Sequence, residues 1–459
     1  MRTTLTSAAA ALLVLGSGVP LAAQSASTSA PANASTPPVA QQGAAAQPAA
    51  TTPAAPTLPI PITFTGEVRS RTEWDAPGGA AAADLFSMLR TRFAARVDPT
   101  PGVSVVLQLQ DSRVLGTETN SRVASTVDQF DLHQGYLQLS GAWRASDLAL
   151  RAGRQEIVLG NERLVGAGNW TNTGRTFDGV RALASAKGTG GADRWSATAF
   201  AAIMEENGRR FGGATAGTPS LPDHFVAGAY LTRGAPQKTG ADVTLLYDGG
   251  AQYRSFANAD RATLDARLRA AIAAGLRLEL EGAAQSGTQS FVAAGGAQSG
   301  QRVRAWLLGA RLARSVSRAA LTVGVDALSG DATPSDGEYT AFSTMFATNH
   351  PYYGLMDVIG DPAATTKERG LRDAFVNVAL NVTPAFVPRL ELHRFTLATG
   401  NDRALGLESD LVAPIKLPAN TSLELGLSLF RNGTAAPSLS LGDPGTTKRW
   451  LYAQLRAGF

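Results

Sequence analysis

The sequence predicts an all-β protein, a transmembrane antiparallel β-barrel of about 18 strands. Two observations predict this fold. From Ile62 onward, apolar and polar residues alternate along most of the chain, and the links between the alternating segments are short and long by turns. The polar positions carry too many arginines and carboxylates for a packed soluble core, so the apolar face must point outward into lipid and the polar face toward water.

The alternation is clear near both ends of this region. One face of the first segment carries Ile62, Phe64, Val68 and Trp74, and the other carries Glu67, Arg69, Arg71 and Glu73. The last segment alternates in the same way and stops on the aromatic Phe459, which is typical of the closing strand of a bacterial outer-membrane barrel. A single strand of this kind also fits a half-exposed soluble sheet, but its repetition along the chain favours a water-filled barrel.

Composition agrees with this class of protein. The chain has 48 Gly, 44% hydrophobic residues and a mean hydropathy of -0.03, which is too polar for a helical membrane protein. It has no Cys, which excludes disulfides and thiolate metal sites. The net charge of +4 is too small and too dispersed to indicate nucleic-acid binding. We therefore expect no cofactor, no metal and no nucleic-acid partner.

Three regions follow one another along the chain. Residues 1–23 have a charged start, a short apolar run and small residues, which predicts a signal peptide. Residues 24–57 are almost entirely Ala, Pro, Ser, Thr and Gln, which predicts a disordered periplasmic linker. Residues 58–459 form the predicted barrel, and a signal peptide before a barrel places the protein in the outer membrane of a bacterium.

The lengths of the links predict the number of strands. We expect short periplasmic turns at 98–102, 141–146, 187–193, 234–241, 273–275, 314–318, 383–388 and 417–421. We expect long extracellular loops at 75–83, 114–129, 158–174, 205–224, 249–260, 287–301, 329–370, 399–403 and 432–448. These links separate about 18 strands, an even number that leaves both ends of the barrel in the periplasm. A plug inside the barrel would have to come from 329–370, since no other loop is long enough.

One stretch of the sequence resembles a known family. Residues 151–181 read RAGRQEIVLGNERLVGAGNWTNTGRTFDGVR, which is similar to the signature region of the alginate export family of outer-membrane barrels. Four shorter stretches are also similar: LQLQDSR at 107–113, DLHQGYLQL at 131–139, TNHPYYGLMD at 348–357 and GLESDL at 406–411. The resemblance covers most of the chain after the linker. It implies an 18-stranded barrel that passes an anionic polysaccharide out of the cell.

Strand parity nominates arginines that face the lumen and contact the transported solute. They are Arg69, Arg71, Arg90, Arg92, Arg96, Arg151, Arg181, Arg302 and Arg304. A guanidinium group presents paired donors that match a uronate carboxylate, so a lumen lined by arginines would attract polyanions. The alternative is that these arginines pair with carboxylates across the strands and only stabilise the barrel wall.

Charged and aromatic residues are concentrated in the signature stretch. They are Arg154, Arg163, Trp170, Arg175 and Asp178. Their place at a strand-loop-strand junction predicts ion pairs that hold the base of a loop, and not a catalytic group. We expect Trp170 and Phe177 to belong to the aromatic girdle at the outer interface.

The sequence predicts a transport protein and not an enzyme. Four scattered histidines give no recognisable nucleophile arrangement and no metal-ligand spacing. The first hypothesis is a passive channel that exports a uronate-type polysaccharide, supplied by periplasmic synthesis or secretion machinery. The second is a diffusion porin for the uptake of small anionic or neutral solutes. A third is a structural barrel that anchors its linker to a periplasmic partner.

Overall fold

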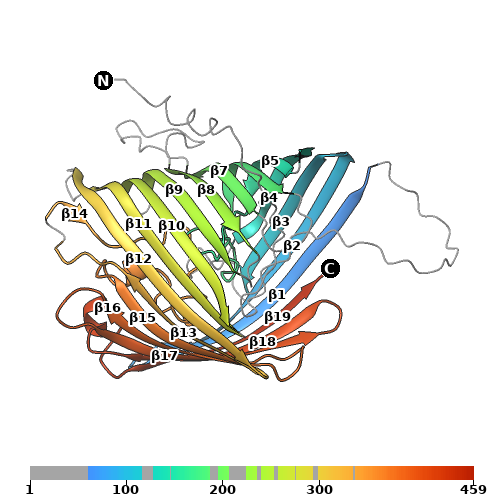
Figure 1. The fold of residues 1–459 in the computed structure, drawn as a ribbon. Coiled ribbons are helices and arrows are strands. Elements are labelled where there is room, and N and C mark those ends of the chain that lie inside the picture. The colour runs from blue at the N-terminus through green and yellow to red at the C-terminus, as the bar shows by residue number, and fades with distance from the viewer. Residues whose placement is uncertain are drawn as a thin grey trace, which may run out of the picture.

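A computed structural model gives the fold of the chain (Figure 1). It describes residues 60–115, 128–144, 146–186, 195–205, 224–234, 239–252, 257–273, 275–292, 298–333 and 336–459. The predicted signal peptide and linker, at 1–23 and 24–57, lie outside the described residues and stay predictions. No helix among the described residues is both long and apolar enough to cross a membrane.

Most of the described chain is β-strand. The strands are β1 (Ile62–Ala76), β2 (Asp84–Thr100), β3 (Val103–Val114), β4 (Asp128–Trp143), β5 (Ser146–Gln155), β6 (Phe177–Ala186), β7 (Trp195–Glu205), β8 (His224–Arg233), β9 (Gly240–Gln252), β10 (Ala257–Ala273), β11 (Leu276–Val292), β12 (Gln298–Val316), β13 (Ala319–Leu328), β14 (Glu338–Tyr339), β15 (Leu371–Leu380), β16 (Arg389–Leu397), β17 (Ala404–Leu417), β18 (Thr421–Asn432) and β19 (Thr447–Gly458). Two helices of one turn each, α1 (Pro362–Thr365) and the 3-10 helix η2 (Ala436–Leu439), lie in the connections.

The strands close into a barrel of 18 antiparallel strands, as predicted. Each strand pairs with its neighbour in the chain, except that β13 pairs directly with β15, and β1 closes the ring by pairing with β19. The closing register runs from Glu67 opposite Gly458 to Ala76 opposite Arg449. Figure 1 shows β1 in blue beside β19 in red. The remaining strand, β14, is a two-residue piece of a loop that pairs in parallel with β12 outside the ring pattern.

The connections differ strongly between the two ends of the barrel. One end carries short turns, such as 101–102 between β2 and β3 and 418–420 between β17 and β18. The other end carries the long connections, of which 329–370 between β13 and β15 is the longest. The predicted alternation of short and long links holds for most of the chain. It is wrong for the link between Gln252 of β9 and Ala257 of β10, which was predicted to be long but is shorter than the link between β6 and β7. In outer-membrane barrels the short turns face the periplasm and the long loops face outward.

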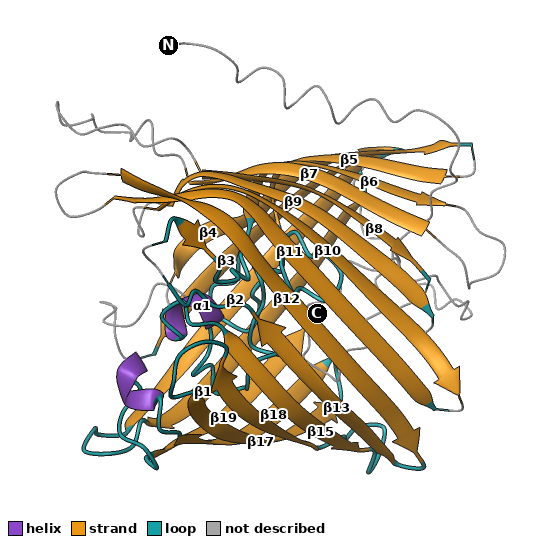
Figure 2. Cartoon of the chain, turned by 60° about the vertical axis from the view of Figure 1, so that its left-hand side comes forward, coloured by secondary structure: helices purple, strands orange, loops and turns teal. Residues whose placement is uncertain are grey.

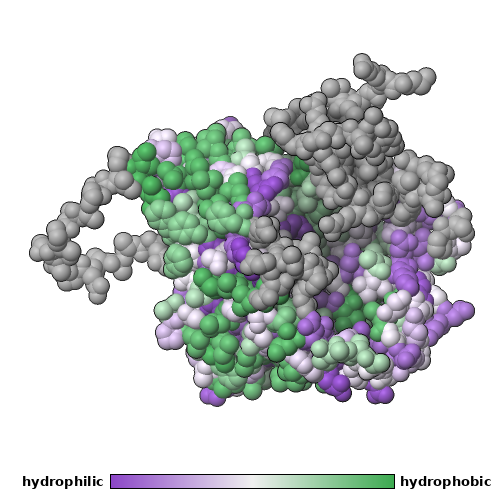
Figure 3. Space-filling model, turned by 180° about the vertical axis from the view of Figure 1, so that it is seen from behind, coloured by the Kyte–Doolittle hydropathy of each residue, from purple (hydrophilic) through white to green (hydrophobic). Residues whose placement is uncertain are grey.

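Strand parity sorts the side chains as expected on the outer face. On β1, Val68 is 41% exposed while its neighbour Arg69 is 4% exposed. Leucines repeat on the exposed positions of many strands, and the surface view shows broad hydrophobic areas on the wall (Figure 3). An apolar band of this kind suits lipid, because apolar side chains need no hydrogen-bond partner in the hydrocarbon.

The interior differs from the prediction of a uniformly polar, water-filled lumen. Inward-facing apolar side chains on the strands pack against apolar side chains from the long connections and form one buried core. It includes Leu164, Val165, Phe177, Phe200, Val226, Leu246, Leu307, Leu328, Phe342, Phe346, Tyr353, Ile359, Phe395 and Phe430. In Figure 2 the teal loops lie inside the ring of strands. Sequence alternation misses this core because an inward apolar residue looks the same as an outward one.

Ring closure by β1 and β19 can be tested with a disulfide. Ser70 and Leu455 are register partners on the outer face, and antiparallel partners lie about 4.5–5.5 Å apart at Cα, within disulfide range. We expect S70C/L455C to cross-link, because the chain has no other Cys. The measurement is the mobility of the heat-denatured protein on a non-reducing gel. The control S70C/L427C places the second Cys on β18, two strands from β1, and should not cross-link; equal cross-linking of both pairs would contradict the closure.

Candidate functional site

Two long connections fold into the barrel and define its interior. The β5–β6 loop (156–176) contains most of the signature stretch, and the β13–β15 loop (329–370) contains α1. Both contribute to the core inside the ring. The β5–β6 loop contacts two sides of the lumen: β1–β3, which we call the basic wall, and Glu281 of β11 with Asp326 of β13, which we call the acidic wall.

Arginines on β1 and β2 hold the β5–β6 loop through its backbone. Arg69 donates from Nη1 to the Asn169 carbonyl at 2.7 Å and from Nη2 to the Thr171 carbonyl at 2.8 Å. Arg71 donates to the Trp170 carbonyl at 2.8 Å, and Arg90 donates to the Asn169 carbonyl at 3.2 Å. These contacts satisfy carbonyl groups that have no partner within a strand. The three guanidinium groups therefore act as fixed anchors of the loop.

Neighbouring side chains extend this anchorage. Arg92 donates to Gln110 Oε1 at 2.6 Å, to Asn169 Oδ1 at 2.9 Å and to Glu156 at 3.2 Å. Gln110 and Ser112 on β3 donate to the loop carbonyls at positions 173 and 172, each at 2.8 Å. Thus three consecutive strands bind five consecutive loop residues.

The anchoring arginines also have counter-charges in the wall. Glu67 lies 2.6 Å from Arg90 and 2.6 Å from Arg456, and Glu73 lies 2.7 Å from Arg71. The sequence offered two interpretations of these arginines, solute binding and ion pairing within the wall. The structure adds a third, because the same guanidinium groups anchor the loop backbone. Solute binding by Arg69, Arg71, Arg90 and Arg92 stays a prediction.

On the opposite wall the same loop inserts its own arginine. Arg163 is buried, lies 2.8 Å from Asp326 on β13 and 4.0 Å from Glu281 on β11. Its guanidinium also lies 4.4 Å from the centre of the Tyr352 ring. Asn161 donates to Glu281 at 3.1 Å. The β5–β6 loop therefore crosses the lumen, with its carbonyls on the basic wall and its cation on the acidic wall.

The two loops are joined to each other. Val165 and Phe346 form a parallel β-bridge, and Thr348 donates to Glu162 Oε2 at 2.6 Å. Arg175 donates to the Phe346 carbonyl and, at 3.2 Å, to the carbonyl of Ala347. The β13–β15 loop is thus part of a plug, a question that the sequence left open. The prediction that no other loop is long enough to contribute is wrong, because the β5–β6 loop crosses the barrel.

The prediction that Trp170 and Phe177 belong to the outer girdle is wrong. Trp170 stacks on His350 with ring centres 3.9 Å apart, and the Arg71 guanidinium lies 4.1 Å from its ring centre. Phe177 is 1% exposed and belongs to the interior core. Trp170 follows the loop into the barrel, whereas Phe177 begins β6 on the inward face that it shares with Arg181.

Three other predicted residues face outward. On β12, Arg302 and Arg304 share the parity of the exposed Trp306 and Leu308, so the prediction that they line the lumen is wrong. Arg304 lies 3.4 Å from Glu338 of β14, outside the ring. Arg154 pairs with Asp178 at 2.8 Å on the exposed face at the ends of β5 and β6. That ion pair at the loop base has the form that the sequence predicted.

Arg151 and Arg181 have a different environment from the anchoring arginines. They are register partners on β5 and β6, and both face inward. Arg151 donates to Gln138 at 2.8 Å and lies 4.1 Å from the Tyr136 ring centre. Among the described residues, neither has a carboxylate within ion-pair distance. Arg96 also lies on the lumen side, but it pairs with Asp98 at 3.0 Å.

Burial and charge shift the titration of the loop groups in opposite directions. Burial raises the pKa of Glu162, against the bond from Thr348. Burial also opposes ionisation of Glu156, yet the hydrogen bond from His133 and the charge of Arg92 hold its pKa below the ordinary value. Burial opposes the charge of Arg163 as well, but Asp326 and Glu281 raise its pKa above the ordinary value. The two charged groups of the crossing loop, Glu156 and Arg163, therefore each have an opposite charge nearby that offsets the cost of their burial.

The partners of the loop were not identified from the sequence. Asp326, Glu281 and Gln110 lie on strands far from the loop in sequence, and the main contacts on the basic wall are backbone carbonyls, which leave no sequence signal. Among the residues that the structure describes, no three His, Cys, Asp or Glu side chains are grouped so that they could hold a metal ion.

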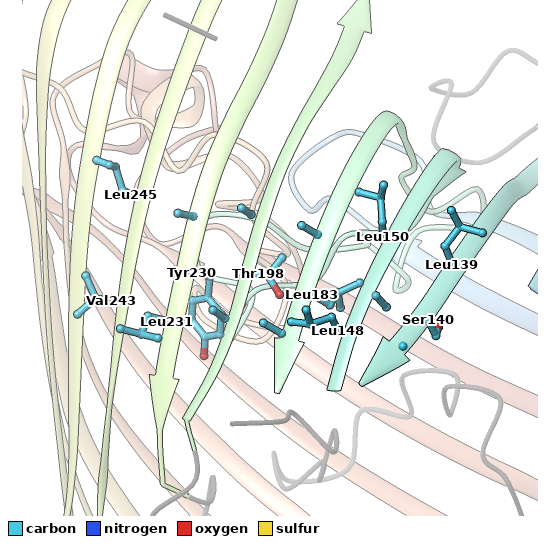
Figure 4. Close-up of a pocket in the computed structure, with 17 residues that line it drawn as sticks. Leu139, Ser140, Leu148, Leu150, Leu183, Thr198, Tyr230, Leu231, Val243 and Leu245 are labelled. Carbon is cyan, nitrogen blue, oxygen red and sulfur yellow. The ribbon is translucent and has the colours of Figure 1, made fainter. Parts of the chain in front are cut away.

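A large groove lies on the outer wall and not in the lumen. It has a volume of about 720 Å³ and runs over β4 to β9, with alanines between leucine rows (Figure 4). Leu148 and Leu150 lie on one side, and Leu231, Val243 and Leu245 lie on the other. Since the exposed residues on these strands face lipid, the groove is not part of the transport path.

The raised pKa of Glu162 predicts an opposite pH response for two substitutions. The neutral carboxyl stabilises the folded loop at acid pH, and this advantage is lost as the pH rises above the ordinary value of 4.5. We therefore expect E162Q to gain stability relative to wild type as the pH rises above about 4.5. Glu156, whose pKa is lowered, contributes stability that is lost as the pH falls below about 4.5, so E156Q should differ most from wild type above that pH and regain relative stability on acidification below it. The readout is the urea midpoint of the refolded barrel; parallel responses of the two variants would contradict the assignment.

Removal of the buried cation should cost far more than removal of an exposed one. R163M removes the loop cation from Asp326 and Glu281, while Arg311 stays within ion-pair distance of both, which predicts a loss of about 3 kcal/mol. The matched control R154M breaks an exposed pair and should cost less than about 1 kcal/mol. Urea unfolding in lipid vesicles measures both, and equal losses would rule out the crossing-loop contact as a stabilising element.

Comparison with known proteins places the fold and the family. No curated protein matches the sequence significantly. Three solved structures have similar folds. OccK8 (OprE) of Pseudomonas aeruginosa has a TM-score of 0.54 at 12% identity, with 87% of this chain and 98% of that chain covered. OpdQ of the same organism has 0.55 at 12%, covering 87% and 98%, and a BenF-like porin from Pseudomonas fluorescens Pf-5 has 0.55 at 10%, covering 87% and 99%. Identities this low show the fold alone.

The family comparison agrees with the resemblance in the signature stretch. The model of the family described as alginate export matches residues 61–404, which is most of the barrel. Together with the closed 18-stranded barrel, it makes this protein a channel of the bacterial outer membrane. In such barrels the long loops face the outside of the cell. The chain belongs to the alginate export family.

Proposed function

We propose that the protein is a passive channel that exports an anionic, uronate-type polysaccharide, and that lumen arginines attract the polymer. Membership of the alginate export family supports a polysaccharide cargo. The inward-facing pair Arg151 and Arg181 is the observation that carries the anionic part of the proposal. Periplasmic synthesis or secretion machinery would deliver the polymer to the short-turn end.

The chemistry of this pair suits a uronate. Two guanidinium groups on adjacent strands repel each other unless an anion lies between them. Each offers paired donors to a carboxylate, and Gln138 and the face of Tyr136 beside them suit sugar hydroxyls and a sugar ring. Weak contacts of this kind let a polymer enter and leave, which transport requires.

A second candidate is a diffusion porin for small anionic or neutral solutes. The loops that fill the long-loop half of the barrel favour it, since they leave less room for a polymer than an open lumen would. OpdK of Pseudomonas aeruginosa, whose fold is similar at 10% identity, has been crystallised with vanillate, which is also a carboxylate. Where the solute of the porin is anionic, the two candidates share the charge of the ligand and differ in its size.

The charge pair can be tested in planar bilayers. Wild type should give a reversal potential of the anion-selective sign in a salt gradient, because uncompensated lumen cations concentrate anions. R151Q/R181Q should shift that potential toward zero. The control R302Q/R304Q removes the same charge from the outer face and should leave selectivity unchanged. Cation selectivity in wild type would contradict the polysaccharide channel and a porin for small anions, and would leave only a porin for neutral solutes.

Oligouronates separate export from uptake. Block of the current by an oligouronate of about ten sugars, lost in R151Q/R181Q, is expected for the polysaccharide channel. Passage of small carboxylates without any block by the oligouronate would instead favour the diffusion porin.

A further inference from the structure

An unusual set of arginines lies on the lipid-facing side of the barrel wall. Arg372 on β15, Arg394 on β16, Arg431 on β18 and Arg449 on β19 share the parity of exposed leucines on their strands and are themselves exposed. Each lies near the end of its strand that leads into a long loop. We call these four residues the arginine belt.

Strand register places the belt in one staggered line. Arg394 lies opposite Leu407, and Leu407 lies opposite Arg431. Arg449 lies opposite Leu429, which is two residues from Arg431, and Arg372 lies opposite Thr396, which is two residues from Arg394. Arg372 and Arg394, and likewise Arg431 and Arg449, are diagonal neighbours about 7–8 Å apart. Arg394 and Arg431 lie on either side of β17, so they are about 10 Å apart. Four cations therefore follow one another across five adjacent strands.

The belt lacks counter-charges. Among the described residues, none of the four arginines makes an ion pair or a side-chain hydrogen bond, in contrast to the inward arginines of the basic wall. No Asp or Glu occupies an outward position on β13 or on β15 to β19. Like charges in a line and without counter-ions repel one another, so the geometry requires anions from outside the protein.

The level of the belt in the membrane is set by the apolar residues beside it. Toward the middle of the barrel, Leu390, Leu411, Leu427, Leu451 and Trp74 form one continuous row in register. An arginine on a lipid-facing wall costs most at the membrane centre and little at the interface. Each belt arginine lies between this row and the long-loop end of its strand, within four residues of that end, so we infer that the belt lies at the depth of the lipid head groups on the long-loop side.

We propose that the arginine belt binds lipopolysaccharide through the phosphates of its lipid A. The long-loop end faces the outer leaflet, which in such a membrane consists of this phosphorylated glycolipid. Arginine forms paired hydrogen bonds with phosphate, and clusters of basic residues at head-group depth recruit anionic lipids. The leucine row below the belt provides the contact for the acyl chains.

Native mass spectrometry of the full-length protein in detergent tests this assignment, with purified lipid A as the probe. Bisphosphorylated lipid A should bind wild type more tightly than monophosphorylated lipid A. R394Q/R431Q should weaken binding of the bisphosphorylated form by roughly thirtyfold for the two residues together. Heat-modifiable mobility on gels verifies that the variants are folded barrels.

The matched control is R314Q/R318Q, which removes two exposed arginines at the short-turn end of the same wall. It should bind lipid A as wild type does. An equal loss in both double variants, equal binding of both lipid A forms, or tighter binding of phosphatidylglycerol than of lipid A would overturn the proposal. A lipid-free dimer that disappears in R394Q/R431Q would also overturn it, in favour of a second copy of the chain as the occupant.

Discussion

The structure depends on the donation of arginine N–H groups to loop carbonyls inside the barrel. A chain segment that crosses the lumen has no strand beside it to satisfy its backbone, so each carbonyl needs a side-chain donor. Arg69, Arg71 and Arg90 provide those donors, and Glu67 and Glu73 compensate their charge. At the other wall the loop reverses the arrangement, because Arg163 is its own cation and Asp326 is part of the barrel.

The contacts between the loop and the two walls determine which lumen arginines can still bind a solute. The arginines nearest the crossing loop have most of their donors occupied, whereas Arg151 and Arg181 have no carboxylate partner in the described chain. A count of lumen arginines therefore overstates the number that an anion can reach. The proposed selectivity rests on one pair of residues beside the loop, and the loop in turn depends on the other arginines.

Arginine donors on the outer wall also need acceptors, but there the acceptors come from outside the protein. A lumen arginine finds its acceptors in a loop, but an arginine of the belt faces the membrane, where the described part of the chain provides none. The phosphates of the outer leaflet are the acceptors available at that depth. One residue type thus has two roles, which strand parity separates.

The sequence by itself determined the class of fold, the 18 strands and the alternation of turns and loops, because a period of two and the link lengths are local properties. It also located the signature stretch and the ion pair of Arg154 with Asp178. Only the tertiary structure decided that Trp170 and Phe177 lie inside, that Arg302 and Arg304 face outward, and that the β5–β6 loop crosses the lumen. Parity says only which residues of one strand share a face, and not whether that face points into the barrel or outward. The path of a loop depends on partners far away in sequence, such as Asn161 and Tyr352, which are about 190 residues apart.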